Sequence, residues 1–373
     1  MKVAITLNTS WNIYNFRLGL IRALLDAGHE VVAIAPKDDF SDKLEENGCT
    51  FVPIQMENTG SNPWHDYQLY RQLKKVYRIH RPTIIFHFTI KPNIYGTLAA
   101  HVLGIPVINN VSGLGTVFLS NGLASTVAKK LYRWAFSHAH LVFFQNADDR
   151  ETFLTEISLP QLPTELVPGS GINLSSFQPY PLPEVSAPVF LMVARLIIDK
   201  GVNEYIEAAK MTLKKHPLAK FQLLGKLDPD HARGIPATTI EEAVQAGVIE
   251  YLGETEDVKL FLEKATCVVL PSYREGTPRT MLEAAACGRP VITTDVPGCR
   301  EVVINGQTGL LCEVKSAEDL HKKMEKIGAM SHHELEIWGR NGRQLIEDKF
   351  DEQIVVCQYL KHASNIINQL SSE

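Results

Sequence analysis

The sequence lacks the features that would place it across a membrane or in an oxidising compartment. No apolar run reaches the roughly 18 residues of a membrane-spanning helix, and the start MKVAITLNTSWN has no signal-peptide layout. The six cysteines form no C-x-x-C pair and no zinc-ligand spacing, which predicts buried thiols in a reducing cytoplasm. We therefore expect a cytoplasmic protein that neither spans a membrane nor is exported.

Acidic residues are absent from one long stretch of the chain. Residues 67–147 contain no Asp or Glu, but they contain nine Lys or Arg residues, at positions 71, 74, 75, 78, 81, 91, 129, 130 and 133. Such a concentration predicts that this half of the chain meets an anionic surface or substrate. Within it, residues 119–140 combine Lys129, Lys130 and Arg133 with Trp134. This amphipathic helix either packs on the sheet or lies in lipid headgroups, and the lack of acids favours membrane contact.

The apolar segments predict alternating strands and helices. The chain is 45% hydrophobic and 8% aromatic, as in globular proteins, and 373 residues suffice for two domains. A strand at 1–7, a helix at 11–25 and a strand at 30–35 form a β-α-β unit, which requires a parallel sheet. Further strands are expected in two series, at 83–87, 107–110 and 141–144, then at 189–194, 221–224, 248–252, 268–270 and 291–293.

A proline-rich segment separates the two series of strands. Residues 179–188 contain prolines at 179, 181, 183 and 188, a composition typical of a semi-rigid linker. We expect an α/β protein with two doubly wound, Rossmann-like domains, residues 1–178 and 189–350. Because such sheets bind ligands at the carboxyl ends of their strands, the pattern predicts a cleft between the domains.

Residues 268–292, VVLPSYREGTPRTMLEAAACGRPVI, place two glutamates around a turn between a buried strand and a helix. Pro278 stands near the first position of the helix expected at 279–287, where its missing N–H has no cost. The unpaired N–H groups of that first turn suit a phosphate or a polarised hydroxyl. Glu275 would lie in the loop over this helix end, and Glu283 further along the helix would accept hydrogen bonds from a ribose diol. In isolation, two such carboxylates are most often solvated charges.

The wider pattern resembles a known family. Glu275 and Glu283 form E-x7-E, and the chain also contains, in this order, VARLIIDKG at 193–201, FQLLGKL at 221–227, EYLGETEDV at 250–258, DVPGCREVV at 295–303 and NGQTGLLCE at 305–313. Together these segments resemble the retaining glycosyltransferases of the GT-B fold, in particular family 4. The resemblance implies two Rossmann-like domains facing a central cleft, with a last helix at about 351–371 packed back on the first domain.

The resemblance also implies roles for individual residues. Arg195 and Lys200 match the cations that hold the donor's diphosphate, where negative charge grows as the glycosidic bond breaks. Together with Glu275, near the donor sugar, they form the expected catalytic set. The residues expected to bind the nucleotide sugar are Gly225, Leu252, Gly276, Thr277, Pro278, Arg279 and Glu283.

The first domain departs further from the family. Many members have a Gly-Gly pair after the first strand, where this chain has Asn8, Thr9 and Ser10, and a His where it has Ser112. The acceptor side is assigned to Asn8, Ser10, Ser112 and Gly113, and the residue that orients the acceptor hydroxyl stays unassigned. His87 lies in an expected strand and is interpreted as packed rather than catalytic. FHFTIKPNIYG and VINNVSGLGTVF resemble the subset of enzymes that extends undecaprenyl-diphosphate-linked sugars.

No Asp-x-Asp metal motif stands at a suitable strand end, so we expect no essential metal and no cofactor. The family likeness implies transfer with retention, and the lack of a clear carboxylate nucleophile favours front-face attack. The sequence thus predicts a cytoplasmic, peripherally membrane-associated glycosyltransferase with a UDP-sugar donor, a lipid-diphosphate-linked acceptor and no nucleic-acid partner. A UDP-sugar epimerase of the same fold would need acids and a His near the sugar. A non-catalytic nucleotide-sugar-binding module is disfavoured because Arg195, Lys200 and both glutamates are present.

Overall fold

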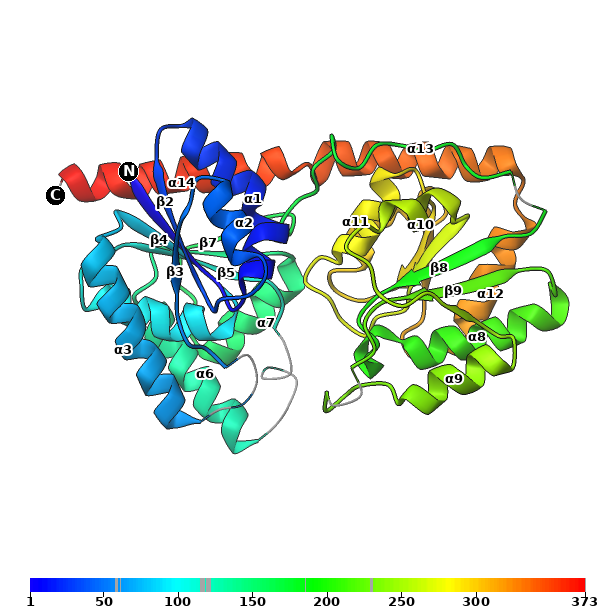
Figure 1. Ribbon diagram of the computed structural model, residues 1–373, viewed down its shortest axis with the longest axis horizontal. Coiled ribbons are helices and arrows are strands. Elements are labelled where there is room, and N and C mark those ends of the chain that lie inside the picture. The colour runs from blue at the N-terminus through cyan, green and yellow to red at the C-terminus, as the bar shows by residue number, and fades with distance from the viewer. Residues whose placement is uncertain are drawn as a thin grey trace. The chain divides into compact units, whose positions relative to one another are not determined.

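A computed structural model describes residues 1–57, 60, 62–114, 118, 122–184, 186–228 and 231–372. They form two compact units (Figure 1), which are Met1–Ser170 with Glu352–Glu373, and Gly171–Asp351. Each unit is a parallel β-sheet with helices on both faces, so the expected pair of doubly wound Rossmann-like domains is confirmed.

The first unit contains seven parallel strands in the order β3-β2-β1-β4-β5-β6-β7. Their bounds are β1 Lys2–Thr6, β2 Glu30–Ala35, β3 Thr50–Pro53, β4 Ile84–Phe88, β5 Val107–Val111, β6 Leu141–Phe144 and β7 Thr164–Leu166. Strands β4 to β6 are buried on both faces; β4 and β6 are accordingly almost entirely apolar, while β5 buries the polar Asn109 and Asn110.

Alternate side chains of these strands face two layers of helices. One layer consists of α1 Ser10–Asp26, α2 Ser41–Glu46 and α14 Glu352–Ser372. Phe86 and Phe88 of β4 point to this layer and contact the ring of Tyr359 in α14. Ile85 points to the other layer, where it packs with Leu73 of α3. That layer contains α3 Pro63–His80, the π-helical turn η1 Pro92–Gly96, α4 Thr97–His101, α6 Leu123–Phe136 and α7 Ala147–Ile157.

The second unit contains six parallel strands in the order β10-β9-β8-β11-β12-β13. These are β8 Val189–Val193, β9 Lys220–Leu224, β10 Glu250–Tyr251, β11 Cys267–Leu270, β12 Val291–Thr294 and β13 Gly309–Cys312. Its helices are α8 Val202–Lys215, α9 Ala237–Gln245, α10 Lys259–Lys264, α11 Arg279–Ala286, α12 Ala317–Ala329 and α13 His332–Lys349, with single 3-10 turns η2 Ile198–Lys200 and η3 Arg300–Val302. From β8 the chain first builds the sheet outward through β9 to β10, and then returns to place β11 on the other side of β8. The gap between β8 and β11 is therefore the topological switch point, where open α/β sheets bind their ligands.

The boundary between the two units lies earlier in the chain than expected. Residues 1–178 were expected in the first domain and 179–188 in a linker, but the units meet at residues 170 and 171. Phe177 and Leu182 are buried in the core of the second unit. The guanidinium of the buried Arg289 donates to the carbonyl of Pro181 at 2.8 Å. The described part of the proline-rich segment is therefore packed on the second unit, and residue 185 lies outside the described residues.

Five cysteines are buried free thiols, as expected, but Cys357 on α14 is exposed, so the prediction is wrong for that residue. Val355, Val356 and Tyr359 lie on the side of α14 that packs against the strands, and Cys357 lies on the solvent-facing side. Among the described residues, no helix has the length and apolar content needed to cross a membrane.

Candidate functional site

The predicted donor-binding residues lie on loops after the strands of the second unit. Lys200 ends η2, which follows β8, and Glu275 lies between β11 and α11. Their side chains form an ion pair, and both are largely shielded from solvent. Two loops that are separated by more than seventy residues in sequence are thus joined at the switch point of the sheet.

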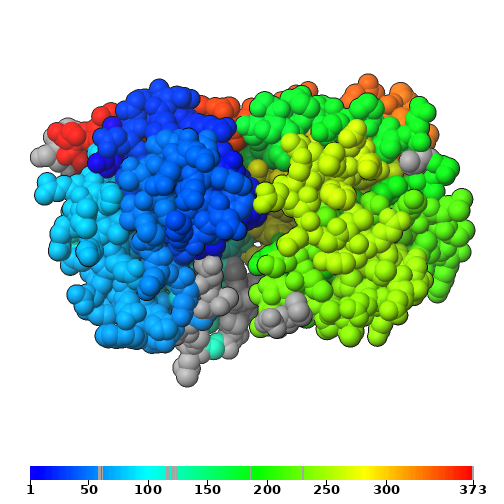
Figure 2. Space-filling view, viewed as in Figure 1, coloured from blue at the N-terminus to red at the C-terminus, as the bar shows by residue number. Residues whose placement is uncertain are grey.

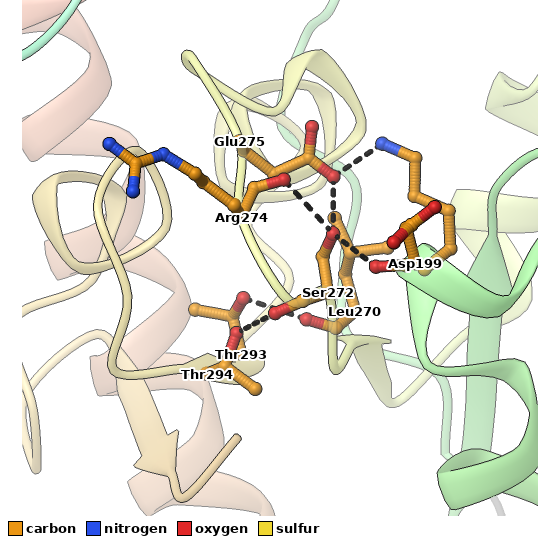
Figure 3. Close-up of polar contacts among 8 residues, drawn as sticks. Asp199, Leu270, Ser272, Arg274, Glu275, Thr293 and Thr294 are labelled. Carbon is orange, nitrogen blue, oxygen red and sulfur yellow. Dashed lines mark hydrogen bonds and ion pairs between the residues drawn. The ribbon is translucent and has the colours of Figure 1, made fainter. Parts of the chain in front are cut away.

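Ser272 is a third member of this cluster, and the sequence analysis assigned it no role (Figure 3). Its hydroxyl oxygen is fully buried and lies 2.6 Å from Oε1 of Glu275 and 3.0 Å from the carbonyl oxygen of Asp199. A hydroxyl has one proton, so it donates to one acceptor at a time, and a charged acceptor gives the stronger bond. Ser272 therefore fixes the carboxylate of Glu275 from the side opposite to solvent.

The backbone around Ser272 is held by two threonines of the adjacent strand β12. The hydroxyl of Thr294 donates to the carbonyl of Ser272, and that of Thr293 donates to the carbonyl of Leu270 at 2.7 Å. The amide of Tyr273 donates to the carbonyl of Asp199 at 2.8 Å. The loop after β11 is consequently fixed on two sides before any ligand binds, a property that catalytic groups require.

Two glycines allow the loops to approach this closely. Gly201 has φ of 75°, and a Cβ there would lie 2.1 Å from the carbonyl oxygen of Pro271. Gly225 has φ of 151°, and its Cβ would lie 1.8 Å from the carbonyl oxygen of Ala194. Any larger residue at either position would push apart the strand ends that carry the cluster.

Helix α11 begins at Arg279, directly after Pro278, and buries Glu283 one turn later. Nε of Arg279 lies 2.9 Å from Oε1 of Glu283. Burial raises the pKa of Glu283 above its ordinary value, and the charge of Arg279 acts in the opposite direction. The structure thus brings Glu283 to a shielded position with a cationic partner.

The remaining predicted donor residues border the same strand ends. Arg195 is exposed after β8 and forms no ion pair with any residue that the structure describes. The hydroxyl of Tyr251 donates to the carbonyl of Gly225 at 3.0 Å, and the amide of Leu252 donates to the carbonyl of Leu223 at 2.9 Å. Gly276 is buried and Thr277 is half-buried between Glu275 and α11.

The acceptor-side residues are not gathered into one cluster. Ser10 has no exposed surface, and its hydroxyl bonds to the carbonyl of Pro36 at 2.8 Å and to the hydroxyl of Ser41 at 2.9 Å. Ser10, the first residue of α1, thus holds the β2–α2 loop and the start of α2, and its role as an acceptor contact stays a prediction. Asn8 accepts from Nδ2 of Asn12 at 2.8 Å. Ser112 is exposed next to the half-buried Gly113 and donates to the side chain of Asn110 at 3.0 Å.

His87 is fully buried in a polar network inside the first unit. Its Nε2 lies 2.9 Å from the hydroxyl of Tyr77, and its Nδ1 lies 3.0 Å from Oδ1 of Asn109. Burial lowers the pKa of His87 to about 3, so the ring is neutral at physiological pH. The interpretation of His87 as a packed residue agrees with this environment.

The first unit also contains a cavity of about 910 Å³, lined by the loops after β2 and β3 and by α3, with Lys37, Gln55, His65, Gln68 and Lys91 among its polar residues.

Within the part of the chain that the structure describes, no three His, Cys, Asp or Glu side chains are placed to hold a metal ion together.

Family models match both halves of the chain. Residues 179–345 match the model described as "Glycosyl transferases group 1", and residues 2–146 match that described as "Glycosyl transferase 4-like". A Campylobacter jejuni protein, N,N'-diacetylbacillosaminyl-diphospho-undecaprenol alpha-1,3-N-acetylgalactosaminyltransferase, is 30% identical over 387 residues, covering 99% of this chain and 100% of the relative. An Escherichia coli UDP-Gal:alpha-D-GlcNAc-diphosphoundecaprenol alpha-1,3-galactosyltransferase is 26% identical, covering 76% of this chain and 74% of the relative.

Solved structures share the fold at lower identity. Sucrose-phosphate synthase from Thermosynechococcus elongatus superposes with a TM-score of 0.80 at 22% identity, covering 100% of this chain and 99% of that chain. The Anabaena protein HepE in complex with UDP and glucose has a TM-score of 0.79 at 17% identity, covering 98% of this chain and 99% of that chain. These neighbours are GT-B proteins, which confirms the expected fold class.

Proposed function

Because this chain belongs to the group 1, family 4 glycosyltransferases of the GT-B fold, we propose that it transfers a hexose or N-acetylhexosamine from a UDP-sugar to an undecaprenyl-diphosphate-linked acceptor, with retention of configuration. The observation that most supports this proposal is the shielded cluster of Lys200, Glu275 and Ser272. In it, a cation and an oriented carboxylate lie together at the strand ends, where open α/β sheets bind their ligands.

In this proposal Lys200 and Arg195 receive the diphosphate. Negative charge accumulates on the leaving nucleoside diphosphate as the sugar–oxygen bond breaks, and cations that are already in place stabilise it. Arg195 has a free fork of donors for two phosphate oxygens, and Lys200 supplies a point charge. The diphosphate would compete with Glu275 for Lys200, while Ser272 keeps its hydrogen bond to Oε1 of Glu275, so that Oε2 would be the oxygen that accepts from a sugar hydroxyl.

The nucleoside is held by α11 and its surroundings. Glu283 would accept hydrogen bonds from the ribose diol; burial raises the pKa of this carboxyl group, and the neighbouring Arg279 acts in the opposite direction. Gly225 and Leu252 would border the base. Backbone N–H groups of Gly276, Thr277 and Arg279 would meet the sugar hydroxyls or phosphate near Pro278.

The bond changes then follow the front-face route. The bond between sugar C1 and the diphosphate oxygen breaks, and its electron pair leaves with UDP. The acceptor oxygen bonds to C1 from the same face, and its proton passes to the departing diphosphate oxygen. No metal ion and no cofactor takes part in this scheme, and the acceptor side retains Asn8, Ser10, Ser112 and Gly113 as candidate contacts in the first unit.

The choice of acceptor is supported by the Campylobacter jejuni and Escherichia coli relatives, whose names both specify a diphospho-undecaprenol-linked sugar as acceptor. Such a lipid substrate implies a peripheral protein at the inner face of the cell membrane. The test is a panel of UDP-, GDP- and ADP-sugars with undecaprenyl-diphosphate-linked monosaccharides, followed by NMR of the new anomeric bond. We expect transfer from a UDP-sugar with α linkage retained. A β-linked product, or transfer only from another nucleotide, would overturn that part of the proposal.

A further inference from the structure

Helix α3, Pro63–His80, presents an unusual outward surface. Trp64 is 62% exposed, Tyr67 49% and Ile79 63%, although large apolar side chains normally bury. Between them, Arg71, Lys75 and Arg78 are also exposed. The spacing of these six residues places them on one side of the helix, which we call the α3 face. The chain segment that contains α3 lies at the surface of the first unit (Figure 2).

The opposite side of α3 fixes the orientation of the α3 face. Leu69, Leu73 and Tyr77 are buried against the sheet. The side chain of Asn62 caps the first turn, and Arg81 ends the helix in a left-handed conformation with φ of 47°. The helix of 18 residues is about 27 Å long, so its exposed aromatic end and its basic stretch form one extended, rigid surface.

The charges of the α3 face are not neutralised. Arg71, Lys75 and Arg78 form no ion pair with a described residue. The one acid within the helix, Asp66, is buried and lies 2.8 Å from Nζ of Lys91. Helix α6 differs, because its Lys129 pairs at 2.8 Å with Glu156 of the acidic helix α7. Among the described helices on this side of the sheet, α3 and α6 are both basic, and the positive charge of α3 is the less neutralised by acids.

We propose that the α3 face docks this protein on an anionic lipid bilayer. Trp and Tyr rings favour the interface between water and hydrocarbon, and Lys and Arg are attracted by anionic headgroups. The inference rests on the proposed function only in that a lipid-linked acceptor lies in the same bilayer. The cavity bordered by His65 and Gln68 of the same helix would then open close to the membrane surface.

A bilayer fits the α3 face better than a nucleic acid does. Proteins that bind single strands place aromatic rings along a basic groove, so that successive bases stack on them. Here the two exposed aromatic rings of the face lie at one end of a convex helix, 6.0 Å apart, and the cations follow them. That arrangement offers no groove for a strand, and it suits a planar anionic surface.

The test is co-sedimentation of the full chain with phosphatidylcholine vesicles that contain about one third phosphatidylglycerol. Replacing Arg71→Gln, Lys75→Gln and Arg78→Gln together is expected to weaken partitioning roughly 100-fold, since each cation near an anionic surface contributes about fivefold. The double variant Trp64→Ala, Tyr67→Ala tests the face without changing charge and should also release the protein. The matched control removes three exposed cations from the second unit, Lys214→Gln, Lys264→Gln and Lys326→Gln, and is expected to bind as the wild type does.

Docking is overturned if the wild type does not sediment with these vesicles, if both α3 variants still do, or if the control triple loses binding equally. Strong competition by a single-stranded DNA oligonucleotide would instead identify a nucleic-acid surface. Transfer to a short-chain, water-soluble acceptor is measured in parallel and should be unchanged in the α3 variants. If the wild type binds vesicles but transfers no sugar, the proposed function fails while the docking surface stands.

Discussion

The two units use the carboxyl ends of their parallel strands differently. In the second unit, Lys200, Ser272 and Glu275 meet in one shielded cluster that faces the switch point. In the first unit, the buried hydroxyl of Tyr77 forms hydrogen bonds with the side chains of Thr6 and His87. The hydroxyl of Ser10 bonds to the carbonyl of Pro36 in the β2–α2 loop. The same sheet architecture thus provides a prepared charged site in one unit and a stabilised scaffold in the other. Substitutions in the two units should accordingly have different consequences.

The largest effect on transfer is expected in the second unit. Arg195→Ala or Lys200→Ala removes a charged hydrogen bond to phosphate, worth about 1.5–3 kcal/mol, and should lower kcat/KM roughly 10- to 100-fold. Steady-state kinetics with the preferred UDP-sugar measure this loss. Lys264→Ala, an exposed cation of the same unit, is the control and should leave the rate unchanged. Near-normal turnover by a folded double variant would remove the diphosphate role.

Ser272→Ala should produce a smaller loss that is confined to the chemical step. The change frees Glu275 to rotate, and one lost hydrogen bond to a charged group corresponds to about 1.5 kcal/mol, or roughly tenfold in kcat. UDP affinity, measured by calorimetry, should stay the same because Ser272 faces Glu275 rather than α11. Ser272→Cys keeps the volume with a weaker donor and should give an intermediate kcat. A fall in UDP affinity that matches the fall in kcat would assign Ser272 to the fold of the whole loop instead.

Donor binding should depend on pH through Glu283. A charged carboxylate accepts from the ribose hydroxyls more strongly than a neutral carboxyl group does, and burial raises the pKa of Glu283 above the ordinary 4.5. As pH falls from neutral, Glu283 therefore takes up a proton before an exposed glutamate does, and UDP affinity should weaken while still above pH 4.5. Glu283→Gln should bind UDP about tenfold more weakly at neutral pH and lose this acid-side step. Glu242→Gln, an exposed acid of α9, should keep both the affinity and the pH dependence.

In the first unit the same kind of substitution should change stability rather than turnover. Tyr77→Phe removes the hydroxyl that lies 3.1 Å from Oγ1 of Thr6 and 2.9 Å from Nε2 of His87. Leaving buried polar atoms without a partner costs about 1–3 kcal/mol, so the free energy of unfolding should fall by that amount. Urea denaturation measures it, while UDP affinity stays constant. A large loss of donor binding without loss of stability would contradict the view that this buried network stabilises the first unit and takes no part in donor binding.

The sequence predicted the order of the elements well because their apolar runs are long. It placed a strand at 268–270 and a helix at 279–287, against β11 Cys267–Leu270 and α11 Arg279–Ala286. It missed β3, β7 and β13, which have only three or four residues each and lie at the edges of their sheets. Short strands at a sheet edge have too few alternating residues to be distinguished from loops.

The site was predictable where a single motif specifies it and unpredictable where distant segments meet. Glu275 and Glu283 stand in one motif, so their neighbourhood followed from sequence. The contact of Ser272 with Asp199 joins residues 73 positions apart, and the burial of Ser10 depends on Ser41, which follows a different strand. Such contacts result from the packing of the whole sheet. Pro271 and Ser272 directly follow β11. This Pro-Ser pair could have indicated a role for Ser272, because serine favours turns in which its hydroxyl bonds to nearby backbone groups.

The smallest effect is expected from removing divalent cations. If Arg195, Lys200 and the first turn of α11 together neutralise the diphosphate, transfer needs no Mg²⁺ or Mn²⁺, and EDTA should change kcat/KM less than about twofold. The comparison becomes sharper in the Lys200→Ala variant, where the missing charge leaves room for an external cation. Added Mg²⁺ should then restore part of the lost rate in the variant while leaving the wild type unaffected. Loss of wild-type activity in EDTA, with recovery on adding Mg²⁺ or Mn²⁺, would show that the second unit does not meet the diphosphate charge with its own side chains.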